Sequence, residues 1–390
     1  MIDYSKALSR KARDIKPSGI RKFFDMLEGR KGVISLTVGQ PDFDTPWHIR
    51  DAGIDSIADG HTFYTSNRGT PEMRQELAKY MERRFGLRYH PEDELLVTVG
   101  ASEAIDLAIR ATVDQGDEVI IPVPSFVCYG PLVEMAGGKP VFVESTEDEG
   151  FKLTPDKLKA ALTDRTKLIV LPYPSNPTGV ILEREELEAL AEVILETNAV
   201  VLSDEIYAEL TYGKKHCSIA TLPGMRERTV VVNGFSKAYA MTGWRLGYSA
   251  APAPITDAMF KIHQYGVMCA PTASQYAATE ALRNGDSDIE MMKEEYDRRR
   301  KYLVRALNEI GLPCQKPEGA FYVFMKVGHY GLSSEEFCER LLEEQQVAIV
   351  PGNAFGECGE GYARLSYAYS LEHLKEAVKR MERFVRSLNK

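Results

Sequence analysis

Short apolar runs alternate with helical patterns between about residues 94 and 250. Seven of these runs have the length and composition of strands: ELLVTVG, DEVIIPVP, KPVFVE, TKLIVLPYP, AVVLSDE, TVVVNGFS and RLGYSAAP. Several are apolar almost throughout, which is typical of strands buried on both faces. Amphipathic segments such as SEAIDLAIRATVDQG lie between them. The pattern predicts an α/β fold with an open, mainly parallel seven-stranded sheet covered by helices.

The pattern changes after about residue 285. A long helix over roughly 288–310 is followed by GAFYVFMKV, another helix, VAIVPG, YARLSYA and a closing helix from about residue 371. This order predicts a second, smaller α+β domain. We therefore expect a large domain at residues 45–285. Residues 1–44, which include an N-terminal arm, and residues 286–390 would form the small domain.

Charge and composition exclude several classes of protein. The 390 residues carry a net charge of −9, from 48 basic and 57 acidic side chains, so no basic stripe for a nucleic acid is expected. No apolar run reaches the ~18 residues that span a bilayer, and the N-terminus lacks the apolar core of a signal peptide. The six cysteines show no CxxC spacing, so no metal site is expected. The expectation is a cytoplasmic protein without membrane or nucleic-acid partners.

Open parallel sheets bind ligands beyond the carboxyl ends of their strands, so the residues that follow each strand are informative. Gly100-Ala101-Ser102 follow LLVTV and open a helix, where free backbone N–H groups can bind a phosphate. Ser102 could equally be a simple helix cap. Phe126 follows IIPVP, and Asn176 lies between two prolines in SNPTG, although an ordinary turn uses the same residues.

Two further strands end in charged residues. Asp204 follows VVLS, with Tyr207 close behind, and a buried carboxylate at such a position requires a cation or hydrogen bonds. Ser236 and Lys237 follow VVVNGF, and a lysine is rarely buried without a function. Arg245 adds a fixed positive charge eight positions later.

Together these strand ends supply an amine, a carboxylate, a phosphate turn with an arginine, a flat aromatic ring, and phenol or amide donors. Pyridoxal 5′-phosphate (PLP) has matching parts: an aldehyde, a ring nitrogen, a phosphate, a flat ring and a phenolate oxygen. PLP is therefore the cofactor that the residues predict.

The motifs SNPTG, SDEIY and SKAYAMTGWR, in this order and spacing, resemble the class I/II aminotransferases of PLP fold type I. The resemblance runs from about residue 15 to the last helix. The most similar subgroup is the prokaryotic aromatic amino acid aminotransferases, through LTVGQPDFDTP, PEGAFYVF and VVNGFSKAYAMTGWRLGY. The N-acetyl-diaminopimelate aminotransferases are near neighbours, through SGIRKF, LPYPSNPTGV and IHQY.

The resemblance implies roles around the cofactor ring. Lys237 would bind the aldehyde and then move the substrate α-proton, while Asp204 would pair with the ring nitrogen. Tyr207 and Asn176 would donate to the phenolate oxygen, and Asn176 would also face the substrate. Phe126 would stack on the ring.

The resemblance also implies phosphate and substrate contacts. Arg245, Ser236 and the amides of Gly100, Ala101 and Ser102 would hold the phosphate. The family often has a hydroxyl three residues before the lysine, but this sequence has Gly234 there. Arg364 in YARLSYA and Gly39 in TVGQPDF would bind the substrate α-carboxylate. Tyr64 in TFYTSNRG would reach the phosphate of a neighbouring subunit, which implies a homodimer with shared sites.

The expected reaction moves the amino group of an L-amino acid, aromatic or from a broad range, to a 2-oxo acid such as 2-oxoglutarate. No residue stands out as an anchor for a side-chain carboxylate. N-acetyl-diaminopimelate or aspartate aminotransfer remains an alternative. A carbon–sulfur β-lyase of the same fold type is another, and it would release ammonia and pyruvate without an acceptor. A PLP-sensing regulator is disfavoured, because the chain has no basic N-terminal winged-helix segment.

Overall fold

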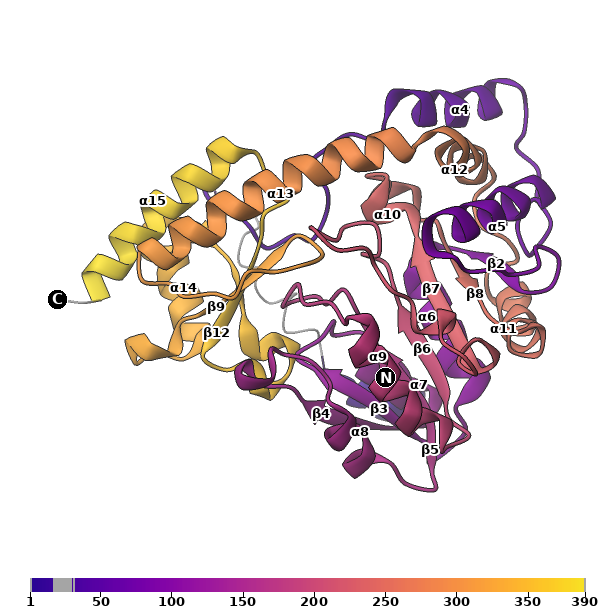
Figure 1. The fold of residues 1–390 in the computed structure, drawn as a ribbon, viewed down its shortest axis with the longest axis horizontal. Helices are drawn as coiled ribbons and strands as arrows, with labels where there is room; N and C mark the ends of the chain where they lie inside the picture. The colour runs from indigo at the N-terminus through magenta and orange to yellow at the C-terminus, as the bar shows by residue number, and fades with distance from the viewer. Residues whose placement is uncertain (1, 17–29, 31, 389–390) are drawn as a thin grey trace.

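The computed structural model describes residues 2–16, 30 and 32–388. Its centre is a seven-stranded sheet in the order β2-β8-β7-β6-β5-β3-β4, in which β8 runs antiparallel to both neighbours and all other pairs are parallel (Figure 1). The strands are β2 (Leu95–Thr98), β3 (Glu118–Val123), β4 (Lys139–Glu144), β5 (Thr166–Leu171), β6 (Val200–Asp204), β7 (Thr229–Gly234) and β8 (Gly247–Ala250). The predicted mainly parallel α/β sheet is confirmed.

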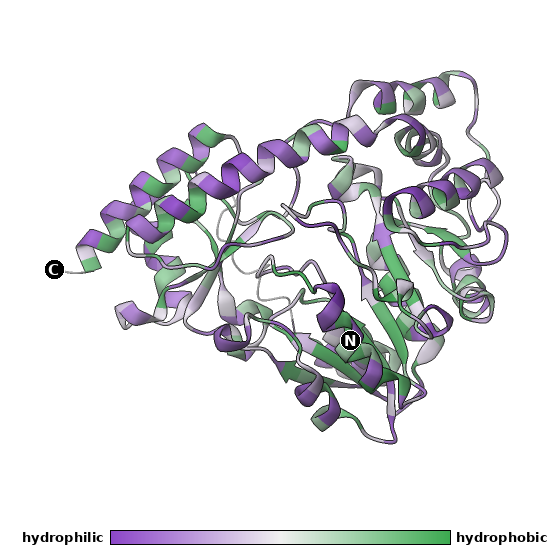
Figure 2. Ribbon diagram, in the orientation of Figure 1, coloured by the Kyte–Doolittle hydropathy of each residue, from purple (hydrophilic) through white to green (hydrophobic). Residues whose placement is uncertain are grey.

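Most of the sheet is buried, and its two edge strands differ, because β2 is buried along its whole length and β4 is partly exposed. The central strands β3, β7 and β8 are buried along their whole length, as their continuous apolar runs require. The edge strand β4 has exposed positions at Lys139, Phe142 and Glu144. Figure 2 shows the same contrast, with hydrophobic strands inside and mixed colours on the outer helices.

Helices cover both faces of this sheet. On one face, α6, α7 and α11 pack over Val119, Leu168 and Leu202, and on the other, α5, α8, α9 and α12 cover Ile120, Ile169 and Val231. These helices are α5 (Pro71–Phe85), α6 (Gly100–Thr112), α7 (Tyr129–Ala136), α8 (Pro155–Ala161), α9 (Arg184–Leu195), α11 (Ala253–Gly266) and α12 (Thr272–Asn284). Helix α4 (Trp47–Ala58) packs on α12. The large sheet therefore sits in a three-layer sandwich.

A second hydrophobic core gathers the C-terminal elements. Its three-stranded antiparallel sheet has the order β11 (Val350–Pro351), β12 (Tyr362–Ser366) and β9 (Tyr322–Lys326). Strand β1 (Ile34–Ser35) pairs in parallel with β10 (Val347–Ala348), so an N-terminal segment joins this core. The helices are α13 (Asp286–Glu309), α14 (Ser334–Gln345) and α15 (Leu371–Leu388). The domain boundaries at residues 45 and 285 stay a prediction.

The N-terminal arm forms two short helices, α1 (Tyr4–Ala7) and α2 (Arg10–Asp14). The second contacts α7, where the Lys11 ammonium donates to the Met135 carbonyl at 3.1 Å. Within the described ranges, no helix is both long and apolar enough to cross a membrane.

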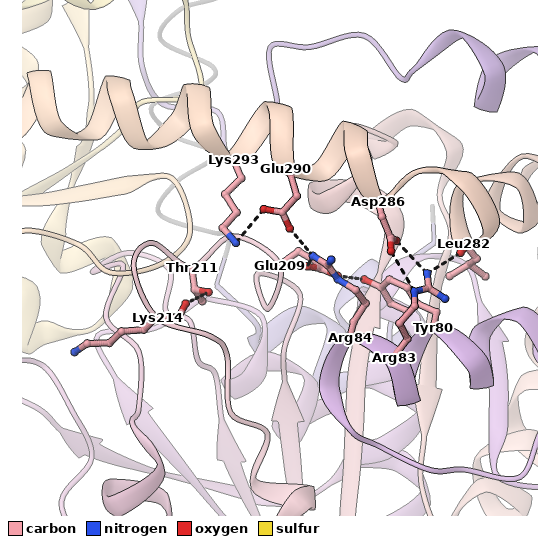
Figure 3. A network of polar contacts seen from close by, with 10 residues as sticks. All are labelled: Tyr80, Arg83, Arg84, Glu209, Thr211, Lys214, Leu282, Asp286, Glu290 and Lys293. Atoms are coloured by element: carbon pink, nitrogen blue, oxygen red, sulfur yellow. Dashed lines mark hydrogen bonds and ion pairs between the residues drawn. The ribbon is translucent and has the colours of Figure 1, made fainter.

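Helix α13 runs from α12 to the C-terminal helices and contributes side chains to both cores (Figure 1). A partly buried polar network near its start links it to α5 and to the loop after β6 (Figure 3). Glu209, on the loop after β6, accepts hydrogen bonds from the Tyr80 hydroxyl at 2.6 Å and from two Arg84 nitrogens at 2.9 and 2.6 Å. Arg84 also donates to Glu290 of α13 at 2.8 Å. The network fixes the loop that carries Tyr207, two residues before Glu209.

Candidate active site

A cavity of about 290 Å³ opens beyond the carboxyl ends of the central strands. It is lined by Thr37, Gly39, Ala101, Ser102, Ile105, Phe126, Tyr129, Pro172, Pro174, Asn176, Asp204, Ile206, Tyr207, Ser236, Lys237, Arg245, Tyr322 and Arg364. The structure thus brings together all of the site residues predicted from the sequence except Gly100 and Tyr64. Both cores contribute, because Tyr322 and Arg364 come from the small antiparallel sheet.

Lys237 lies in α10 (Phe235–Ala238), the helical turn that directly follows β7. Its ammonium donates to the Gly39 carbonyl at 2.6 Å. Burial lowers the pKa of Lys237 to about 8, and the positive charges of Arg245 and Arg364 act in the same direction. A lysine with this pKa has a substantial neutral fraction near neutrality, so it can act as a nucleophile or a base.

Asp204 ends β6 and is buried, which raises the pKa of its carboxyl. Two hydrogen bonds oppose that effect, one from the Tyr129 hydroxyl at 2.7 Å and one from the Ile206 amide at 3.2 Å. In the part of the chain that the structure describes, no cation lies within ion-pair distance of Asp204. A buried carboxylate with this environment suits a protonated ring nitrogen of a ligand.

Arg364 extends into the cavity from β12 and is only 3% exposed. Its guanidinium donates to the Asn176 side-chain oxygen at 3.0 Å and to the Thr37 carbonyl, while its Nε is buried without a hydrogen-bond partner. Among the described residues, no carboxylate forms an ion pair with it. Burial lowers the pKa of this guanidinium. These features exclude a surface ion pair and fit a site for a ligand carboxylate.

Gly39 and Tyr207 meet at Tyr322 beside this arginine. The Tyr207 and Tyr322 hydroxyls are 2.7 Å apart. A Cβ atom at residue 39 would come within 1.9 Å of the Tyr322 hydroxyl, so the backbone approaches this closely only with a glycine. The Tyr322 ring also lies 4.6 Å from the Arg364 guanidinium carbon. The phenols and Arg364 therefore form one packed group.

A second positive region lies at the start of α6. Gly100 has a φ of +77°, and a Cβ there would come within 2.7 Å of Arg245 Nη2, so glycine suits both the turn and the close approach. Ser102 and Ser236 line the cavity beside them. A helix N-terminus next to an arginine is a favourable place for a phosphate. Gly100 itself is not among the residues that line the cavity.

Two predicted residues lie toward solvent. Phe126 is at the rim of the cavity, with its ring edge-on to Tyr129 at 6.3 Å between centroids. Tyr64 lies on the loop between α4 and α5, is 82% exposed, and lines a different groove from this chain's cavity.

The sequence did not single out Thr37, Tyr129 or Tyr322. Tyr129 and Tyr322 resemble core residues because each stands in an apolar run. One signal in the sequence could have drawn attention to these two tyrosines: a phenol in a buried run usually needs a hydrogen-bond partner.

The polar groups that line the cavity match the chemical groups of PLP one by one. They include a buried amine, a buried carboxylate without a cation, a positively charged helix start and an arginine with an unpartnered Nε. By contrast, no group of three or more His, Cys, Asp or Glu side chains in the described residues could hold a metal ion.

Several known proteins are similar to this chain in sequence and fold. The family model for aminotransferase class I and II matches residues 31–381. An aspartate aminotransferase of Pyrococcus abyssi is 47% identical over 97% of this chain and 98% of its own. A probable N-acetyl-LL-diaminopimelate aminotransferase of Bacillus subtilis is 48% identical over 97% and 95%, respectively. The crystal structure of an aromatic aminotransferase from Pyrococcus horikoshii superposes with a TM-score of 0.90, 45% identity, and coverage of 94% and 99%. The chain therefore belongs to the class I and II aminotransferases, which are PLP-dependent enzymes of fold type I.

Proposed function

We propose that this aminotransferase takes the amino group from L-amino acids with aromatic or other large uncharged side chains and passes it to a 2-oxo acid. One observation carries the proposal. Among the described residues, the cationic side chains that line the cavity are Lys237, Arg245 and Arg364, and each already has another role. None of them is left to pair with a carboxylate on the side chain of the donor.

The geometry above and the family resemblance support a set of residues that would hold PLP. They are Lys237 for its aldehyde, Asp204 for its ring nitrogen, Tyr207 and Asn176 for its phenolate oxygen, Phe126 for its ring face, and Ser236, Arg245 and the amides of Gly100, Ala101 and Ser102 for its phosphate. When bound, PLP supplies an aldehyde that exchanges amino groups and a cationic ring that accepts the electron pair left when the Cα–H bond breaks.

Substrate binding and proton transfer would be carried out by residues of this chain. Arg364 and the backbone at Gly39 would hold the α-carboxylate, and Asn176 would help to orient it. The 2.6 Å bond from Lys237 to the Gly39 carbonyl keeps the amine beside that carboxylate position. Lys237 would then take the α-proton, because its lowered pKa leaves part of the amine neutral at working pH.

The test is a panel of amino donors with the purified enzyme and 2-oxoglutarate. Phenylalanine, tyrosine and a large aliphatic amino acid should give higher kcat/KM values than aspartate. Higher values for aspartate or N-acetyl-diaminopimelate, the substrates in the names of two relatives, would contradict the proposal. Because 2-oxoglutarate has a second carboxylate of its own, pyruvate should be compared as an acceptor. Ammonia and pyruvate released from a cysteine conjugate without an acceptor would instead indicate a β-lyase.

Arg364→Ala is expected to raise KM for the amino donor about 30-fold or more, since removing one partner of a buried charged pair costs about 2 kcal/mol or more. The visible spectrum of the bound cofactor should stay unchanged, because the arginine is assigned to the substrate. Steady-state kinetics with a single donor measure the first effect, and absorption spectroscopy measures the second. If the cofactor spectrum changes while KM does not, Arg364 contacts the cofactor and its assignment to the substrate carboxylate is wrong.

We also propose a homodimer whose active sites are shared through Tyr64. The loop that carries Tyr64, the last turn of α11 and the segment after it expose a group of large apolar side chains, Phe63, Tyr64, Tyr265, Val267 and Met268. Phe63, Tyr64 and Val267 line one surface groove. Exposed apolar surface of this kind marks association sites. A cytoplasmic location stays a prediction from the sequence.

Mixing two defective chains tests the shared site. Lys237→Ala and Tyr64→Ala dimers should each be impaired, whereas a heterodimer should have one site with both native residues. Random exchange of equal amounts should restore roughly a quarter of the wild-type activity, because half of the dimers are mixed and one site in each is native. No gain over the parents after proven subunit exchange would mean that each site is formed by one chain.

A further inference from the structure

His263 is a buried histidine that joins two segments near the active site. It lies near the end of α11 and is 0% exposed. Its Nδ1 is 2.8 Å from a Glu103 carboxylate oxygen, and its Nε2 is 2.9 Å from the Asn67 carbonyl oxygen. The Asn67 carbonyl can only accept, so Nε2 donates to it. The contact between Nδ1 and the Glu103 carboxyl group holds one proton, and whichever group carries it, the buried His263–Glu103 pair has no net charge.

Glu103 in turn closes the turn that we assign to the phosphate. Its second oxygen accepts a hydrogen bond from the Val99 amide, just before Gly100. The Thr98 hydroxyl donates to the Gly100 carbonyl at 2.9 Å within the same turn. Glu103 thus fixes the backbone on the N-terminal side of the Gly100–Ser102 amides.

This arrangement creates an electrostatic problem that His263 solves. A carboxylate in the first turn of a helix is stabilised by the helix dipole, but the same helix end must also receive a phosphate. Two anions close together repel each other. Pairing with His263 leaves no net negative charge at Glu103 and keeps the turn favourable for the phosphate.

The second bond of His263 reaches the loop of Tyr64. Asn67 belongs to the segment between α4 and α5, and Gln275 also holds that segment by donating to the Thr65 hydroxyl at 2.9 Å. One imidazole therefore braces the loop with Tyr64 against the turn that starts α6.

We propose that His263 is a positioning residue for phosphate binding, acting through Glu103. It keeps the turn at residues 99–103 in place and cancels the charge of the carboxylate behind it. The inference rests on the proposed phosphate role of Gly100, Ala101 and Ser102.

The test compares two probes on the cofactor-free protein, PLP and pyridoxal, which lacks the phosphate. His263→Leu should raise the dissociation constant of PLP about tenfold, as is typical when the partner behind a ligand-holding group is removed, and leave that of pyridoxal within about twofold. A merely structural defect would weaken both. The control is His48→Leu, since both ring nitrogens of His48 are also hydrogen-bonded, here to the carboxylates of Glu280 at 2.7 Å and Asp288 at 3.0 Å, but neither partner belongs to the turn at residues 99–103.

A second variant tests the electrostatic step. In a Glu103→Gln background, His263→Leu should cost much less PLP affinity, because the charge that His263 neutralises is gone. Equal losses in both backgrounds would overturn the proposal, as would unchanged PLP binding in His263→Leu. If His263→Leu does not fold, His263→Gln provides the same test, because its amide fills the space without a charge.

Arg245→Ala separates this inference from the proposed function. If Arg245→Ala leaves the preference for PLP over pyridoxal unchanged, the phosphate assignment itself fails. If Arg245→Ala removes the preference and the His263 variants keep it, the inference about His263 fails alone.

Discussion

Lys237→Ala is expected to lower kcat by at least about 10⁴-fold, the upper range for one positioned proton-transfer group. The variant loses both the amine that would hold the aldehyde and the base that would take the α-proton. Single-turnover measurements of the oxo acid formed from the donor give the rate. Loss of less than about tenfold would contradict both roles.

The same variant should fold at least as stably as the wild type. The Lys237 amine is buried, and the one hydrogen bond that it donates within the described residues goes to the Gly39 carbonyl. Burying an amine costs free energy, so its removal should keep or raise the melting temperature. The control is Lys261→Ala, which removes an exposed lysine paired with Asp257 and should leave kcat unchanged. A melting temperature well below that of the control would mean that lost structure explains the lost activity.

Asp204→Asn is expected to lower kcat by at least about 100-fold with PLP at saturation. Breaking a buried charge pair costs about 3–5 kcal/mol, and each 1.4 kcal/mol that falls on the transition state is tenfold in rate. Asparagine keeps the shape of the side chain, and its one carbonyl oxygen can still accept the bond from the Ile206 amide while its NH2 group can donate to the Tyr129 hydroxyl oxygen, but it cannot carry the charge. The loss therefore isolates the charge from the packing.

Tyr129→Phe is the matched comparison for Asp204. It removes the 2.7 Å hydrogen bond to the carboxylate and keeps the negative charge. Its effect on kcat should be clearly smaller than that of Asp204→Asn. A larger effect for Tyr129→Phe, or near-normal turnover for Asp204→Asn, would mean that the negative charge of Asp204 is not needed for turnover.

The sheet and its charged strand ends could be predicted because their signals are local. Seven apolar runs indicate seven strands, and Asp204 and Lys237 stand out as charged residues directly after such runs. The direction of β8 could not be predicted, because side-chain alternation is the same in parallel and antiparallel strands.

Other site residues depend on contacts between distant segments. Arg364 and Gly39 could be assigned through the family resemblance, but nothing local shows that Tyr322 approaches Gly39 and Tyr207. From the sequence alone, His263 is one of the polar residues of an amphipathic helix, with no sign of a special role. Its carboxylate partner is 160 residues away in the chain, so only the folded structure reveals the pair.

The central claim is that Lys237 is the residue that holds PLP, and borohydride reduction tests it most directly. Reduction converts the carbon–nitrogen bond between a lysine and the cofactor's aldehyde into a stable amine, which mass spectrometry can locate after proteolysis. The prediction is a single modified lysine, Lys237, in the peptide that contains GFSKAYAM. A cofactor label on another lysine, or no label on a protein saturated with PLP, would contradict the assignment.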